Sequence, residues 1–77
     1  MTNLPSLKAR EVLQTLIKTG FFIHHQTGSH ARLLHQQKAE LRVTVPIHNK
    51  DMPENTLRHI IKQAELTEEE FIRLLRE

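Results

Sequence analysis

A histidine follows a glycine and a serine in the tripeptide Gly28-Ser29-His30, directly after Thr27. A histidine side chain takes and returns a proton near neutral pH, which suits general acid–base catalysis. A ribose 2′-hydroxyl that gave its proton to His30 could attack the neighbouring phosphate, provided that a cation stabilised the phosphorane. Gly28 would let the backbone approach a phosphate closely, and backbone N–H groups and the Ser29 hydroxyl could hold its oxygens. The alternative is that His30 only begins a strand and its ring is solvated.

The other histidines of the chain do not suggest a metal site. They are His24, His25, His35, His48 and His59. A metal site needs three or four converging ligands, whereas His24 and His25 are adjacent on a predicted strand and would point to opposite faces. No metal and no cofactor are therefore expected. If Thr27 and Gly28 form a two-residue turn, His25 lies directly opposite His30 and could assist it. An uninvolved surface position for His25 is the alternative.

Six segments carry the periodicity or the boundary signals of helices and strands. In chain order they are a helix that Ser6 caps and Gly20 ends, strands over 21–26, 29–35 and 41–45, a helix from Pro53 to Ala64, and a short helix that Thr67 and Glu70 cap. The third strand alternates most clearly, with Leu41, Val43 and Val45 predicted to face inward.

This order predicts an α+β fold of the type α-β-β-β-α with a short C-terminal helix added. A three-stranded antiparallel sheet with helices on one face is the most economical packing. The double-stranded-RNA-binding domain has the same order and binds A-form RNA through 2′-hydroxyl and phosphate contacts. Order alone leaves the function open, because one fold hosts many functions.

Composition limits the kinds of site that the chain can build. With 77 residues, 38% of them hydrophobic, we expect a single domain over 1–77 with a shallow site for a large substrate or partner rather than a small molecule. The chain has no cysteine, no apolar run of membrane-spanning length and no signal-peptide pattern at its start, so a cytoplasmic protein is expected.

The charge of the chain is unevenly distributed. Residues 1–50 carry a net charge of +5 and residues 51–77 a net charge of −3. A polyanion on one face would explain this asymmetry, as would an ordinary solvated surface.

Several motifs occur together in an order and spacing that resemble the HicA family of toxins, which are mRNA-cleaving partners of HicB antitoxins. The matching stretches are Gly20-Phe21, Gly28-Ser29-His30, Val43-Thr44-Val45-Pro46 with His48, the segment from Pro53 through Thr56-Leu57 to Ala64, and Glu69-Glu70-Phe71. The resemblance covers roughly residues 6–75.

The resemblance implies a fold like that of the double-stranded-RNA-binding domain and ribosome-independent mRNA cleavage, with His30 as the catalytic histidine. It also implies growth arrest through translation shutdown and a HicB-type antitoxin that covers His30. Two positions depart from the family pattern, which has glycine where this chain has Asn55 and Glu65. Asparagine tolerates left-handed or capping backbone well, whereas Glu65 would cost about 1 kcal/mol if its φ had to be positive.

Three functions follow as hypotheses. The first is an RNA endonuclease toxin in which Gly28 and Ser29 position a phosphate and basic side chains bind the RNA backbone. The expected basic contacts are Arg32, Lys50, Lys8 and Arg10. The second is a non-catalytic RNA-binding module. The third is a protein-interaction domain, in which apolar residues such as Leu34, Ile47 and Met52 would face a partner.

Overall fold

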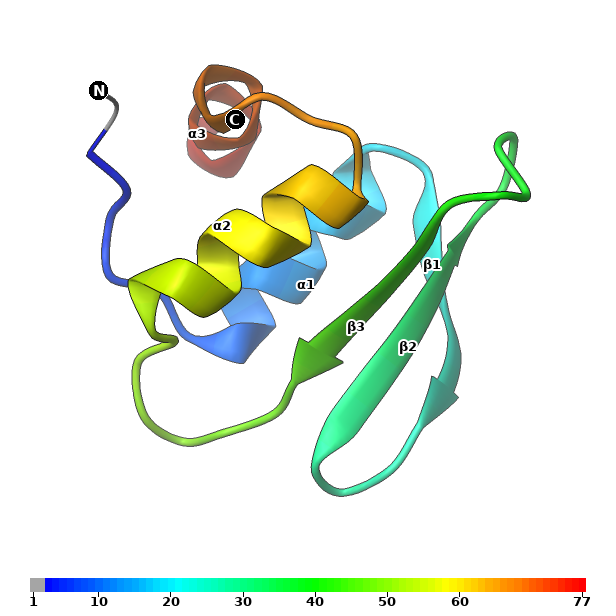
Figure 1. Ribbon diagram of the computed structural model, residues 1–77, viewed down its shortest axis with the longest axis horizontal. Coiled ribbons are helices and arrows are strands. Elements are labelled where there is room, and N and C mark those ends of the chain that lie inside the picture. The colour runs from blue at the N-terminus through cyan, green and yellow to red at the C-terminus, as the bar shows by residue number, and fades with distance from the viewer. Residues whose placement is uncertain (1–2) are drawn as a thin grey trace.

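The computed structural model describes residues 3–77 and has the predicted element order (Figure 1). The elements are α1 (Ala9–Lys18), β1 (Phe21–Gln26), β2 (His30–His35), β3 (Arg42–Pro46), α2 (Glu54–Gln63) and α3 (Glu68–Arg76). The strands form one antiparallel sheet in the order β1-β2-β3. The predicted α+β fold is therefore confirmed. None of the helices within residues 3–77 is long and apolar enough to cross a membrane.

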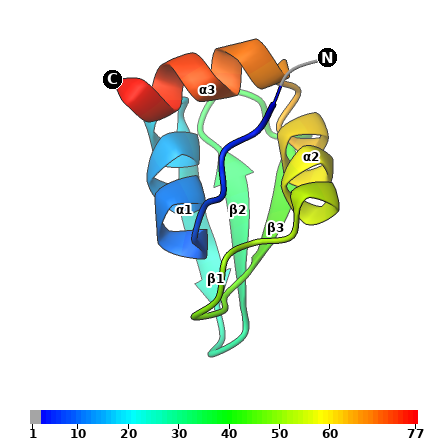
Figure 2. The same ribbon diagram turned by 90° about the vertical axis from the view of Figure 1, so that its left-hand side faces the viewer.

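Both α1 and α2 cover the same face of the sheet, and α3 lies across their ends (Figure 2). The turn between β1 and β2 projects at the opposite end of the molecule from α3. The core fills the space between helices and sheet, and its most deeply buried side chains are Val12, Leu16, Phe21, Leu33, Val43, Val45, Leu57, Ile60 and Phe71. The other face of the sheet carries no helix over the described residues.

The alternation predicted for the third strand is present in β3. Leu41, Val43 and Val45 are buried, whereas Arg42 and Thr44 are exposed. Because side chains alternate between the two faces of a strand, this pattern places Arg42 and Thr44 on the open face of the sheet.

The start of α1 differs from the prediction. Lys8, not Ser6, is the N-cap residue, and its backbone N–H donates to Glu11 Oε1 at 3.0 Å. The Ser6 hydroxyl instead donates to Asp51 Oδ2 at 2.5 Å, across the molecule. The predicted Ser6 cap is therefore wrong, because the helix begins two residues later and Ser6 is used to hold the β3–α2 loop.

His35 links the end of β2 to the end of α1. Its Nε2 lies 2.8 Å from the carbonyl oxygen of Thr19, and its Nδ1 accepts the N–H groups of Gln37 and Lys38, each at 3.1 Å. These contacts place the ring proton on Nε2. The ring also meets Phe21 edge to face, with centroids 4.9 Å apart. Both nitrogens of His35 are thus engaged in structural contacts.

The helices α2 and α3 are joined by an ion-pair network and a tight turn. Arg58 Nη2 lies 3.0 Å from Glu54 Oε2, and Arg58 also pairs with Glu68 at the start of α3. The predicted capping box of Thr67 and Glu70 is present, with both of its hydrogen bonds made. The backbone N–H and then the hydroxyl of Thr67 lower the pKa of the Glu70 carboxyl.

The turn after α2 forces a glutamate into left-handed backbone. Leu66 N–H donates to Ile61 O at 3.1 Å and Glu65 N–H to Lys62 O at 3.0 Å, the hydrogen-bond pattern of a Schellman motif. Glu65 has φ of 58°, as such a motif requires. By contrast, Asn55 lies inside the first turn of α2 and neither caps it nor adopts positive φ.

Replacement of Glu65 by glycine should therefore stabilise the protein. Glycine adopts the left-handed conformation without the steric cost that a side chain incurs, so we expect the free energy of unfolding to rise by about 1 kcal/mol. Urea denaturation of the Glu65→Gly variant measures the change, with Glu69→Gly inside α3 as a matched control that should destabilise. A loss of stability in Glu65→Gly would contradict the account of this turn.

Candidate active site

The turn that joins β1 and β2 is built around the Thr27 side chain. Thr27 N–H donates to His30 O at 2.9 Å, which closes the turn with Gly28 and Ser29 at its centre. The Thr27 hydroxyl oxygen accepts the backbone N–H groups of His30 at 3.0 Å and Ser29 at 3.2 Å. The sequence pattern alone predicts Thr27 only as part of a turn. A Thr that starts a turn and binds the backbone two or three residues on is a known pattern, and it could have indicated this positioning role.

The turn holds His30 with one ring nitrogen engaged and the other open. His30 Nδ1 lies 3.0 Å from the Ser29 hydroxyl oxygen, and the side chain is exposed. Within residues 3–77 the Nε2 atom has no hydrogen-bond partner. If Nδ1 carries the ring proton and donates to Ser29, Nε2 is left as an acceptor that faces solvent. The ring is thus oriented by its neighbour, and its Nε2 is accessible to a bound molecule.

The register of the hairpin corrects the prediction for His25. The predicted two-residue turn was Thr27-Gly28, but the central pair is Gly28-Ser29, so the residue opposite His25 lies two positions further along β2 than predicted. His25 pairs with Arg32, and it does not lie directly opposite His30. The prediction of a direct His25–His30 pair is therefore wrong.

A bulge in β1 nevertheless brings His25 to the same site. The register shifts between Ile23 and His25, which leaves His24 as the extra residue. A shallow pocket of about 460 Å³ is lined by His25, Thr27, His30, Arg32 and Thr44. The site therefore contains two histidines and an arginine on the open face of the sheet.

His24 lies on this face as well, contrary to the expectation that two adjacent strand residues point to opposite sides. It lines a second hollow that shares Arg32 and Thr44 with the first and also includes Arg42. The bulge is the physical reason, because the extra residue breaks the alternation of side chains along the strand. Among residues 3–77, no carboxylate lines either hollow. The open face next to His30 is thus cationic, which favours an anionic ligand.

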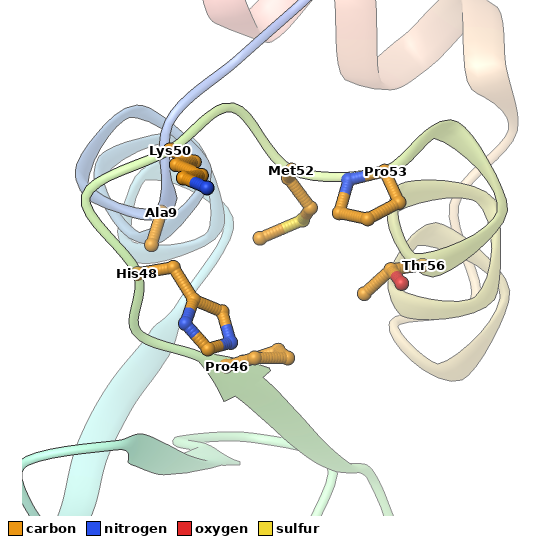
Figure 3. Close-up of a pocket in the computed structure, with 7 residues that line it drawn as sticks. All are labelled: Ala9, Pro46, His48, Lys50, Met52, Pro53 and Thr56. Carbon is orange, nitrogen blue, oxygen red and sulfur yellow. The ribbon is translucent and has the colours of Figure 1, made fainter.

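The remaining predicted basic residues lie at the β3–α2 loop and the start of α1. Lys8 Nζ donates to Asn49 O at 2.9 Å and lies 3.6 Å from Asp51 Oδ1, so its charge helps to hold this loop. The Ser6 hydroxyl and, secondarily, the Lys8 ammonium lower the pKa of the Asp51 carboxyl. Arg10 lines a groove beside Lys8, and Lys50 lines a separate pocket at the same loop (Figure 3).

This loop is connected to the turn that carries His30. The N–H of Ile47 donates to Ser29 O at 2.8 Å, and His30 pairs with Pro46 across the β2–β3 ladder. The structure therefore groups Gly28, Ser29, His30, His25 and Arg32 at one site, and places Lys8, Arg10 and Lys50 at a neighbouring one.

A family model described as the HicA toxin of bacterial toxin–antitoxin systems matches residues 9–66, which is most of the chain. The chain belongs to the HicA toxin family. Its role is thus that of a toxin in a toxin–antitoxin system, and the family implies a HicB antitoxin as its partner. A search of curated proteins found no match. The match includes both the turn with His30 and the β3–α2 loop.

The apolar residues expected to face a protein partner are not the exposed ones. Met52 is buried, and Leu34 and Ile47 are partly buried. The large apolar side chains that are exposed within residues 3–77 are instead Ile17, Phe22 and Ile23. The spacing of apolar residues in the first helix predicts that Ile17 faces the core, whereas 48% of its surface is exposed.

Proposed function

We propose that this HicA-family toxin is an mRNA endonuclease that acts without a ribosome and uses His30 as its general acid–base group. The observation that carries the proposal is the arrangement of His30, with Nδ1 held by Ser29 and the ring beside Arg32 in a cationic hollow. The histidine shifts a proton, the arginine stabilises negative charge, and RNA supplies its own nucleophile.

The proposed step is an attack of the ribose 2′-hydroxyl on the adjacent phosphate. His30 Nε2 takes the 2′-hydroxyl proton while the bond from O2′ to phosphorus forms, and Arg32 stabilises the charge on the phosphorane oxygens. The bond from phosphorus to O5′ then breaks, and His25, which lines the same hollow, would donate a proton to the leaving oxygen. The products are a 2′,3′-cyclic phosphate and a 5′-hydroxyl, and the step requires no metal or other cofactor.

The other predicted contacts have supporting roles in this proposal. Gly28 and Ser29 would hold phosphate oxygens at the tip of the turn, and Arg10 and Lys50 would attract the RNA backbone on either side. Lys8 would contribute mainly by holding the loop, since Asn49 O and Asp51 engage its amine. Cleavage of mRNA in the cytoplasm would stop translation and arrest growth, and a HicB-type antitoxin would inhibit the toxin by covering His30.

Incubation of the purified chain with a single-stranded RNA, in the presence of a metal chelator and without ribosomes, tests this function. We expect fragments that end in a 2′,3′-cyclic phosphate. RNA that is bound but never cut would favour the non-catalytic RNA-binding hypothesis, and a chain that binds only protein would favour the third hypothesis.

Gly28 allows a test that separates the phosphate contact from folding. Its backbone is not left-handed, and a Cβ added there would meet no heavy atom of residues 3–77 within 4 Å apart from its two chain neighbours. We therefore expect Gly28→Ala to leave folding intact or to stabilise it by about 0.4–1 kcal/mol. Cleavage should nevertheless fall by about tenfold or more, since the methyl group displaces the phosphate from the turn. Thermal denaturation and the cleavage rate are measured on the same protein. An unchanged cleavage rate would show that Gly28 does not contact the phosphate.

A further inference from the structure

A small apolar pocket lies between the end of β3 and the N-terminal ends of α1 and α2 (Figure 3). Its volume is roughly 120 Å³, and it is lined by Ala9, Pro46, His48, Lys50, Met52, Pro53 and Thr56. Figure 3 shows the imidazole of His48 next to the ring of Pro46, with the Met52 thioether extending into the same space. Among residues 3–77, the charged side chain that lines this pocket is Lys50, which is exposed.

The pocket is formed by a loop that is already fixed in place. Met52 N–H donates to Leu7 O at 2.7 Å, Lys8 Nζ donates to Asn49 O at 2.9 Å, and the Ser6 hydroxyl binds Asp51. Met52 is buried, with 9% of its surface exposed, so the pocket floor belongs to the core. A pocket built in this way loses little conformational entropy when a ligand enters it.

The position of the pocket links it to the proposed cleavage site. Pro46 lines the pocket and pairs with His30 across the sheet, and the N–H of Ile47 binds the Ser29 carbonyl oxygen. On its other side the pocket shares Ala9 and His48 with the groove that contains Lys8 and Arg10. The pocket therefore lies beside both the proposed cleavage site and the groove with Arg10, where a nucleotide next to the cleaved bond could enter it.

The chemistry of the lining fits the flat face of a nucleobase. Bases of single-stranded RNA leave the stack and pack on aromatic side chains, and His48 offers such a surface with Pro46 beside it. Lys50 at the rim would bind the phosphate of the same nucleotide. An apolar side chain of a partner protein would fill the pocket but would make no contact with the Lys50 charge.

We propose that this pocket receives one unstacked nucleobase of single-stranded RNA next to the cleaved bond, and that His48 thereby determines part of the cleavage-site preference. The inference rests on the proposed function and adds a base-binding subsite to it. His48 is a specificity-determining residue in this proposal and takes no part in proton transfer.

Cleavage of a random-sequence RNA library, with the cut ends sequenced, tests the role of His48. The wild-type chain should favour certain bases at one position near the cut, and His48→Ala should reduce that preference by about fivefold or more because the stacking surface is lost. His48→Phe should retain a preference, since it keeps an aromatic face. His59→Ala is the matched control, because His59 is exposed on α2 and lines neither this pocket nor the His30 hollow. An identical cut profile in wild type and His48→Ala would overturn the proposal.

A binding measurement keeps the pocket testable even without cleavage. The Met52 methyl signal, assigned with Met52→Leu, is followed by NMR in the His30→Ala chain during titration with a 2′-O-methyl single-stranded oligonucleotide. We expect this signal to shift with the single strand and to shift much less with a duplex of the same sequence. A Met52 signal that moves only when a HicB antitoxin is added would show a protein-binding pocket and overturn the proposal. If the wild-type protein never cuts RNA while the Met52 signal still shifts with the single strand, the nuclease function is contradicted and the base-binding pocket is supported.

Discussion

Replacement of His30 by alanine should lower the rate of RNA cleavage by about 10²- to 10⁴-fold, the range expected when a general acid–base group is lost. The reason is local, since His30 is the histidine that the turn both exposes and orients through Ser29. RNA affinity should change little, because the cationic side chains that attract the backbone are untouched. The measurement is a single-turnover cleavage rate alongside RNA binding, with loss of toxicity on expression as the cellular counterpart.

Two control variants make the His30 result specific. His59→Ala removes an exposed histidine on α2 and should cleave as the wild type does. His30→Gln keeps a polar side chain that can bind the Ser29 hydroxyl but cannot carry the proton, so it should be as inactive as His30→Ala. A His30→Ala chain that still cuts RNA at the wild-type rate would refute the assignment.

Replacement of Gly20 by alanine should have the largest effect on stability. Gly20 follows α1 with φ of +106°, a conformation that L side chains rarely adopt, and the added Cβ would lie 2.8 Å from His35 Nε2 and 2.9 Å from its Cε1. His35 cannot easily move, because Thr19 O, Gln37 N–H and Lys38 N–H hold its ring. We expect backbone strain and overpacking to cost about 3 kcal/mol together.

For a domain of this size, such a loss corresponds to a fall in Tm of more than about 10 °C. Thermal denaturation measures it, and Gly28→Ala is the matched control, since that glycine has open space around it. In a His35→Ala background the Gly20→Ala change should cost less, because the clash is removed while the backbone strain remains. Equal costs in both backgrounds would show that contact with His35 is not part of the effect.

Local signals in the sequence predicted the elements but not the details of the site. The alternation of Val43 and Val45, the capping box of Thr67 and Glu70, and Gly20 after α1 each act over a few residues, and each is present in the structure. The bulge at His24 depends on how β1 pairs with β2, which no local pattern in that strand reveals. The central residues of the β1–β2 turn also lie one position later than predicted, because the pairing of the two strands sets the position of the turn.

Long-range contacts explain the other differences. Ser6 resembles an N-cap, but its hydroxyl binds Asp51, a residue far along the chain. Met52 resembles a surface residue in a polar loop, yet the loop folds back on Leu7 and buries it. His48 was noted only as part of a motif, and its place at the mouth of a pocket required the fold. His30 and Arg32 could therefore be proposed from the sequence, whereas the surroundings of both needed the structure.

The central claim is that RNA supplies the nucleophile and His30 moves the proton. The most direct measurement uses a short RNA with one cleavage site, compared with the same RNA carrying a 2′-deoxy sugar on the 5′ side of the cut. We predict that the all-ribose RNA gives a 2′,3′-cyclic phosphate and a 5′-hydroxyl, and that the single deoxy substitution stops cleavage at that bond. Cleavage of the substituted bond, or products with a 5′-phosphate, would contradict this mechanism.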